Sequence, residues 1–149
     1  MIAWRLCRRA YADLSGTGAQ RFGGRWNSPG RPVVYLAEHP ALAALEVRVH
    51  LDLPFELLPA DYVLMLVSLP DPPPDPLADA PPDTNTVATG NAWLAGLRSA
   101  TVKVASVLVP HAWNILLNPG HADAASAAIQ GIEPFRFDPR LWQPLGREG

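Results

Sequence analysis

Short runs of β-branched, leucine and aromatic residues recur along the chain, and glycine, proline or asparagine residues separate them. Such runs are typical of strands, because β-branched and aromatic side chains pack well on a pleated surface, whereas glycine and proline interrupt it. The pattern predicts a strand-rich domain of the α+β class. The expected strands cover residues 2–7, 33–37, 61–69, 101–110, 112–119 and 134–138.

Three other segments have the character of helices. Residues 40–51 begin with Pro40, which suits the first turn of a helix because its missing N–H would be unpaired there in any case. A short helix is expected at 92–98. Residues 122–131 are rich in alanine and end at Gly131, so they also predict a helix.

Two segments are expected to lie outside helices and inner strands. Residues 15–31 are rich in glycine and predict a loop. Residues 69–83 contain many prolines, which fix φ and remove N–H donors. This second segment is therefore expected to be a stiff connection on the surface.

Length, charge and cysteine content limit the class of protein. The 149 residues contain no internal repeat, so we expect a single domain over 1–149. Cys7 is the one cysteine, which excludes an internal disulfide and favours a reducing compartment. A net charge of −2, with acids and bases mixed, argues against direct binding of nucleic acid. The sequence has no signal-peptide pattern and no membrane-spanning run, so we expect a cytoplasmic protein without a membrane partner.

Glu46 interrupts an apolar stripe on the helix expected at 40–51. Leu42, Leu45 and Val49 are spaced to share one helical face with it. A fully buried carboxylate is costly unless it is paired, hydrogen-bonded or protonated, so this position indicates either a partner or a function. The alternative is a glutamate at the edge of the stripe, with its stem packed and its carboxylate in water.

Polar side chains also interrupt the expected strands 101–110 and 112–119. Ser106 shares a face with apolar neighbours, and it either contributes a hydroxyl to a site or bonds to nearby backbone, as serine does more often. Asn114 lies in mid-strand, where its amide could face the same cleft as Ser106. Asn118 is as well explained by capping the turn in NPGH.

Residues 22–30, FGGRWNSPG, place an arginine and a tryptophan between glycines. Arg25 presents a five-donor fork that suits a phosphate, and Trp26 and Tyr35 offer flat apolar faces. Together with a carboxylate, these groups suit a dinucleotide, because the guanidinium can meet the pyrophosphate, a ring can stack on a base and the acid can meet a ribose. The alternative is an ordinary loop with Trp26 packed in the core.

Several common active-site motifs are missing from the sequence. It contains no G-x-G-x-x-G, no P-loop and no nucleophile elbow, so hydride transfer, kinase and esterase chemistry have no motif in their favour. The four histidines lack the spacing of metal ligands, and we expect no metal site and only surface or capping roles for them. These are His39, His50, His111 and His121.

Four segments, taken in order, resemble the RES-domain toxins of bacterial RES–Xre toxin–antitoxin pairs. They are AWRL, GGRWNSPGRPVVYLAEHPALAALEV, VASVLVPHAWNILLNPGH and FRFDPRLW, and they extend over nearly the whole chain. The resemblance implies an α+β fold similar to that of ADP-ribosyltransferases, with two small packed β-sheets and flanking helices around an NAD cleft.

The resemblance also implies roles for individual residues. The family is named after an arginine, a glutamate and a serine, which correspond here to Arg25, Glu46 and Ser106, with Arg5 a weaker match for the arginine. Tyr35 and Asn114 match further active-site positions. The expected catalytic residues are thus Arg25, Glu46 and Ser106, and the expected NAD⁺-binding residues are Arg25, Trp26, Tyr35, Ser106 and Asn114.

The activity implied by the resemblance is consumption of NAD⁺ as a substrate, without a metal. Members of the family break the bond between nicotinamide and ribose and pass ADP-ribose to water, phosphate or a protein side chain. The implied partners are an Xre-type antitoxin that occludes the NAD cleft and a host protein that accepts ADP-ribose, and the complex could be a higher-order oligomer.

Two alternatives to a toxin that ADP-ribosylates a specific protein stay open. The first is an NAD⁺ glycohydrolase or phosphorylase that depletes NAD⁺ without a protein target. The second belongs to another class, a non-catalytic antitoxin-docking or nucleotide-binding module with a degenerate site. The presence of Arg25, Tyr35, Glu46 and Ser106 together argues against the second alternative.

Overall fold

The structure is a computed structural model that describes residues 1–77 and 85–142. Its strands are β1 (Ile2–Arg8), β2 (Val34–Ala37), β3 (Tyr62–Ser68), β4 (Asp75–Pro76), β5 (Thr101–Ala105), β6 (Trp113–Leu117) and β7 (Ala128–Pro134). Its α-helices are α1 (Thr17–Phe22), α2 (Pro40–Arg48) and α3 (Thr86–Gly96), and single 3₁₀ turns occur at Arg9–Tyr11, Phe55–Leu57, Ala122–Ser126 and Pro139–Leu141.

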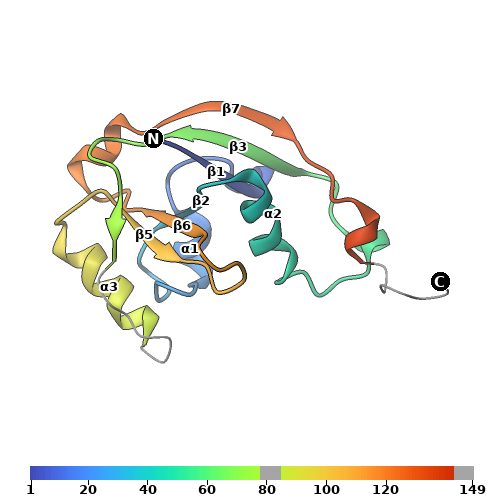
Figure 1. Cartoon of the computed structure of the whole chain (residues 1–149), viewed down its shortest axis with the longest axis horizontal. Coiled ribbons are helices and arrows are strands. Elements are labelled where there is room, and N and C mark those ends of the chain that lie inside the picture. The colour runs from blue at the N-terminus through green and yellow to red at the C-terminus, as the bar shows by residue number, and fades with distance from the viewer. Residues whose placement is uncertain (78–84, 143–149) are drawn as a thin grey trace.

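Within these described residues, all seven strands belong to one hydrogen-bonded sheet in the order β4-β5-β6-β2-β1-β3-β7 (Figure 1). The sheet has two halves, because β1 and β2 are joined through one register pair, Trp4 with Ala37. By contrast, β1 and β3 pair along their whole length, from Ile2 opposite Ser68 to Arg8 opposite Tyr62. Two packed sheets were expected, whereas the structure joins the two halves into one sheet through this short junction.

The two halves share one core. Its fully buried side chains come from β3 in one half, such as Val63 and Met65, and from β6 in the other, such as Ile115 and Leu117. In the part of the chain that the structure describes, few residues outside the strands pack against this cluster, so each half covers the buried face of the other. The expected α+β class is therefore confirmed.

The opposite face of the sheet is covered by helices. In one half, Leu42 and Ala43 of α2 pack in a cluster with Leu6 of β1. In the other half, Trp93 and Leu94 of α3 pack in a cluster with residues of β5 and β6. On this covered face, Asn114 of β6 meets Glu46 of α2.

The helix α2 begins as expected but buries a different stripe. Pro40 occupies the first turn, and the His39 side chain caps it by accepting a hydrogen bond from the Ala41 N–H. The expected stripe was wrong, because Leu45 and Val49 are 38% and 52% exposed. Leucine and valine positions suggested the wrong face, since small alanine side chains allow the helix to approach the strands closely.

Strands with buried side chains on both faces match the sequence prediction well. The runs at 33–37, 61–69 and 112–119 correspond to β2, β3 and β6. In its described part, the proline-rich segment contributes β4, a short strand at the sheet edge that pairs parallel with β5, which agrees with its exclusion from helices and inner strands. Residues 78–83 of that segment lie outside the described residues.

Several expected elements differ in the structure. The loop predicted at 15–31 contains α1, and the helix predicted at 92–98 already begins at Thr86, where Asn85 caps it by accepting from the Ala88 N–H. The alanine-rich helix predicted at 122–131 is a 3₁₀ turn followed by the first half of β7. The strand predicted at 134–138 is absent from the described residues, because β7 ends at Pro134.

The pairing of β7 with β3 explains the last two errors. Every residue of β7 is exposed, so its sequence carries no buried face that would distinguish a strand from a helix. The hydrogen bonds to β3 determine its conformation instead, which is a tertiary effect that a local pattern does not contain.

Candidate active site

Glu46 and Asn114 form the central contact of the site. The Nδ2 of Asn114, on β6, donates a hydrogen bond to the Oε2 of Glu46, on α2, although the two residues are 68 positions apart in the sequence. Glu46 is half-buried at the edge of the packed face of its helix. The carboxylate therefore has both a hydrogen-bond partner and an approach from solvent, which combines the two interpretations left open for it.

Tyr35 shares a sheet face with this pair. Ala37 of β2 lies directly opposite Asn114 of β6, and Tyr35 lies opposite Leu116. Residues that are two apart on one strand point to the same side, and so do residues directly opposite on neighbouring strands. The phenol of Tyr35 and the Glu46–Asn114 pair consequently lie on the same face of the sheet.

The hydroxyl of Tyr35 is hydrogen-bonded on both sides. It accepts a hydrogen bond from the Trp26 N–H at 2.9 Å and donates one to the Asn27 Oδ1 at 2.6 Å. Burial raises the pKa of Tyr35 to about 12, with the Trp26 N–H opposing this shift in part. The phenol is thus neutral at physiological pH and retains the proton that it donates to Asn27.

Stability at alkaline pH should report on this buried hydroxyl. Because burial raises the pKa of Tyr35 from 10.0 to about 12, its contribution to stability is complete below pH 10 and is lost as the pH rises towards 12. We expect the free energy of unfolding to fall more steeply across this range in the parent protein than in Tyr35→Phe. Urea unfolding at several pH values measures both slopes, and parallel slopes would contradict the expectation.

Arg25 presents its guanidinium to solvent. Its backbone carbonyl accepts a hydrogen bond from the Thr86 Oγ1 of α3 at 2.5 Å, and its side chain is exposed. The guanidinium makes no hydrogen bond to any residue in the described ranges 1–77 and 85–142. A cation held by its backbone and free at its side chain suits the binding of an anionic ligand.

Trp26 lies in the core. Its indole is buried in a cluster with Val33, Trp93 and Leu94. This arrangement matches the alternative that the sequence left open, in which the ring packs inside the protein rather than stacking on a base.

Ser106 does not lie on a strand, because β5 ends one residue earlier at Ala105. Its Oγ accepts hydrogen bonds from the N–H groups of Leu108 and Val109, at 3.0 and 3.2 Å, and so closes the turn that follows. The expectation that Ser106 shares a strand face with its apolar neighbours was wrong for this reason. Bonding of a serine hydroxyl to local backbone is the commoner role of this residue type, and Ser106 follows it.

Asn118, the residue that follows β6, caps the turn after this strand. The Asn118 Oδ1 accepts a hydrogen bond from the Gly120 N–H at 2.9 Å, which confirms the capping of the NPGH turn. Its Nδ2 donates to the Leu94 carbonyl of α3 at 3.0 Å. Asn118 therefore belongs to the scaffold.

Arg5 has a structural position at the junction of the two half-sheets. Its Nη1 donates to the carbonyl oxygen of Tyr35 at 3.2 Å, across the short contact between β1 and β2. Its Nε is buried, with no hydrogen-bond partner among the described residues. The exposed Arg25 is thus better placed than Arg5 to bind a ligand.

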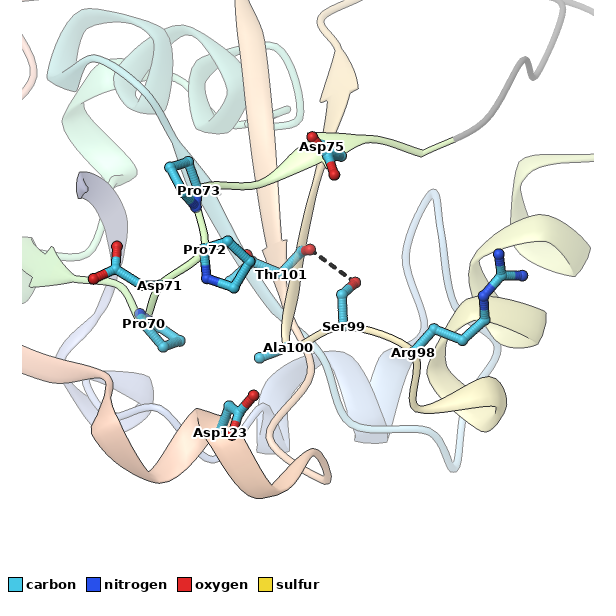
Figure 2. Close-up of a pocket in the computed structure, with 10 residues that line it drawn as sticks. All are labelled: Pro70, Asp71, Pro72, Pro73, Asp75, Arg98, Ser99, Ala100, Thr101 and Asp123. Atoms are coloured by element: carbon cyan, nitrogen blue, oxygen red, sulfur yellow. Dashed lines mark hydrogen bonds between the residues drawn. The ribbon is translucent and has the colours of Figure 1, made fainter.

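Figure 2 shows a pocket whose labelled lining residues include none of the candidate-site residues described above. It has a volume of about 110 Å³, and its lining combines the prolines that precede β4 with the segment from Arg98 to Thr101, which leads into β5. Ligand pockets usually measure about 300–1,000 Å³, so this one is too small for a dinucleotide. Neither Arg25 nor Glu46 is among the described residues that line it.

Comparisons with known proteins give a consistent result. The family model described as the RES domain matches residues 2–139. Toxin Res of Pseudomonas putida strain KT2440 is 43% identical over 149 residues, covering 95% of this chain and all of that protein. The Prs ADP-ribosylating toxin of Sphingobium sp. strain YBL2 is 38% identical over 152 residues, covering 93% of this chain and 94% of that protein.

The fold also matches a solved structure. A chain in the crystal structure of the M. tuberculosis MbcT–MbcA toxin–antitoxin complex superimposes with a TM-score of 0.74, over 95% of this chain and 86% of that one. The sequence identity in this match is 21%, so the likeness lies in the fold. No helix among the described residues has the length and apolar character that crossing a membrane requires.

Proposed function

The chain belongs to the RES-domain family, and from this membership we propose that it is the toxin of a toxin–antitoxin pair and breaks NAD⁺ at the bond between nicotinamide and ribose. The observation that carries the proposal is the Glu46 carboxylate, which is held by the Asn114 amide and remains partly open to solvent. Relatives that are 43% and 38% identical are named as a toxin and as an ADP-ribosylating toxin, which supports the same conclusion.

Glu46 would stabilise the transition state. Cleavage of the bond between nicotinamide and ribose develops positive, oxocarbenium-like charge on the ribose. A carboxylate placed next to that charge, and bonded to a ribose hydroxyl, binds the transition state more tightly than the ground state. Nicotinamide leaves as a neutral pyridine, so the reaction needs no strong general acid.

Arg25 would bind the pyrophosphate of NAD⁺. Its exposed guanidinium offers several N–H donors in a plane, which is the arrangement that phosphate oxygens accept best. Ser106 would orient the nicotinamide or the ribose, because its Oγ uses only its acceptor positions in the turn and its own proton stays available for donation. The ring of Tyr35 would form a wall beside the nicotinamide.

Asn114 would act on the substrate through Glu46 as well as directly. Replacing it by alanine removes the donor to the carboxylate, and we expect kcat to fall about tenfold, since one hydrogen bond to a charged group is worth that much. Steady-state kinetics on NAD⁺ measure the change. Gln130→Ala, which removes an exposed amide on β7, is the matched control, and equal kinetics in the two variants would contradict this role.

We propose transfer of ADP-ribose to a protein as the primary reaction, supported by the relative named as an ADP-ribosylating toxin. Mass spectrometry after incubation of the purified protein with NAD⁺ and a cell lysate tests this proposal. A lysate protein heavier by one ADP-ribose supports transfer. Free ADP-ribose alone indicates a glycohydrolase, and its 1-phosphate, formed only in phosphate buffer, indicates a phosphorylase.

The same experiment decides between an enzyme and a docking module. If no nicotinamide is released under any of these conditions, the catalytic proposal fails, and a non-catalytic nucleotide-binding or antitoxin-docking module takes its place. Growth of a bacterial host that expresses the chain alone gives a second readout, because an NAD⁺-consuming enzyme should arrest growth and an inert module should not.

An antitoxin would cover the surface between the turn that contains Arg25 and the Glu46 side chain. Leu45 of α2 and Val49, the residue that follows this helix, have exposed apolar side chains near Glu46 in the sequence, and such side chains suit burial by a partner protein. The match to a chain from a toxin–antitoxin complex supports this partner. A bound antitoxin should prevent NAD⁺ binding, which calorimetry on the complex can measure.

A further inference from the structure

We propose that Asn27 and Tyr35 are positioning residues that fix the turn carrying Arg25 and thereby set the affinity for NAD⁺. The inference rests on the proposed function for its ligand, but the anchoring itself depends only on contacts within the chain. It gives the Tyr35 hydroxyl a role that a ring stacked beside nicotinamide would not need.

Asn27 is a buried polar residue with its side chain fully engaged. It is 1% exposed, and its Nδ2 lies 2.9 Å from the Ala19 carbonyl, 3.2 Å from that of Ser28 and 2.9 Å from that of Arg31. Its Oδ1 accepts the Tyr35 hydroxyl. A side chain of similar size without polar atoms would fill this space, so the amide contributes a fixed arrangement of the surrounding backbone rather than volume.

Arg25 lies inside the turn that this network holds. The N–H of Gly24 donates to the Asn27 carbonyl at 3.0 Å, and the N–H of Trp26 donates to the Tyr35 hydroxyl at 2.9 Å. A glycine at position 24 lets the backbone of the turn lie this close to the Tyr35 hydroxyl, because a Cβ there would be 2.7 Å from the hydroxyl oxygen. The backbone is therefore fixed on both sides of Arg25.

The helix α3 holds the same turn from outside. The Thr86 hydroxyl donates to the Arg25 carbonyl, and the Asn91 side chain both accepts from the Ser28 N–H at 3.1 Å and donates to the Ser28 hydroxyl at 3.0 Å. The turn is thus hydrogen-bonded to α1, to β2 and to α3, while its arginine side chain stays exposed. Fixing the backbone before the ligand arrives reduces the entropy that binding costs.

The test is a double-mutant cycle on NAD⁺ affinity, measured by calorimetry in a Glu46→Gln background so that the substrate is not consumed. We expect Tyr35→Phe, which keeps the ring and removes the hydroxyl, to weaken binding about tenfold. In proteins that also carry Arg25→Ala, the same change should cause no further loss, because Tyr35 acts through Arg25. Tyr62→Phe, at another buried tyrosine of the sheet, should bind as the parent does.

Two outcomes would overturn the proposal. Unchanged affinity in Tyr35→Phe would show that the hydroxyl is not needed. Additive losses in the double variant would show that the phenol acts on the ligand independently of Arg25. Asn91→Ala, a change at a partly exposed residue, tests the same coupling from the side of α3 should Tyr35→Phe fold poorly, and it should also be non-additive with Arg25→Ala.

Hydrogen exchange separates this inference from the proposed function. Mass spectrometry on the free protein should show at least tenfold faster exchange of residues 24–31 in Tyr35→Phe than in the parent, with the strands unchanged. Equal exchange in the two proteins would overturn the anchoring. Faster exchange in a protein whose parent binds no NAD⁺ would uphold the anchoring and overturn the proposed ligand.

Discussion

Replacing Glu46 by glutamine is expected to lower the turnover of NAD⁺ about a hundredfold while leaving its affinity almost unchanged. Glutamine keeps the size and hydrogen-bonding reach of the side chain next to Asn114 but removes the negative charge. If that charge faces the developing oxocarbenium ion, its loss affects the transition state far more than the bound substrate. A hundredfold change in rate corresponds to about 3 kcal/mol of transition-state stabilisation.

Release of nicotinamide and calorimetric binding of NAD⁺ measure the two effects separately. Glu56→Gln is the matched control, because Glu56 is exposed in the 3₁₀ turn at Phe55–Leu57 and lies outside the site. We expect its turnover to equal that of the parent. Normal turnover in Glu46→Gln would show that the carboxylate does not stabilise the transition state. If NAD⁺ binding were weakened as well, the carboxylate would instead contribute to binding of the substrate in its ground state.

The second large effect is expected on stability, from Gly90→Ala in α3. A Cβ at Gly90 would lie 1.8 Å from the carbonyl oxygen of Trp26, so the helix and the turn cannot keep their present contact. Because both sides of the contact are backbone, no side chain can rotate away to relieve the clash. We expect a loss of about 3 kcal/mol in the free energy of unfolding, at the upper end for overpacked sites.

Urea unfolding measures this loss, and the same helix supplies the control. Among the described residues, a Cβ at Gly96 would meet only the Arg98 side chain, at 3.9 Å. Gly96→Ala should therefore leave stability unchanged or raise it by up to about 1 kcal/mol, since alanine favours the helical conformation. Equal stability of the Gly90 and Gly96 variants would contradict the close packing of α3 on Trp26.

The strands that could be predicted from the sequence are those that bury side chains on both faces. The runs that became β2, β3 and β6 are almost continuously apolar, because two layers cover them. The exposed β7 has no such signal, and α1, a single short helix that contains Gly18, has no apolar stripe long enough to detect. The local sequence pattern thus predicted whether a segment is buried better than it predicted whether that segment is a strand or a helix.

The candidate site was predicted only in part, for a different reason. The sequence pointed to Glu46 and Asn114 separately, and the hydrogen bond between them depends on a register that no local pattern contains. The part played by Asn27 was missed, although an asparagine in a turn between glycines often bonds to neighbouring backbone. Ser106 was placed on a strand because the apolar run continues past Ala105, where the ladder with β6 ends.

The sequence separation of the central contact has a consequence for the protein during its synthesis. At roughly 5–20 residues per second, a ribosome adds Asn114 about 3–14 s after Glu46. In addition, β1 is synthesised first but lies between β2 and β3 in the sheet, so it stays unpaired until those two strands have been synthesised. A chain that ends before Asn114 therefore has no partner for the Glu46 carboxylate, so the candidate site cannot form until β6 has been synthesised.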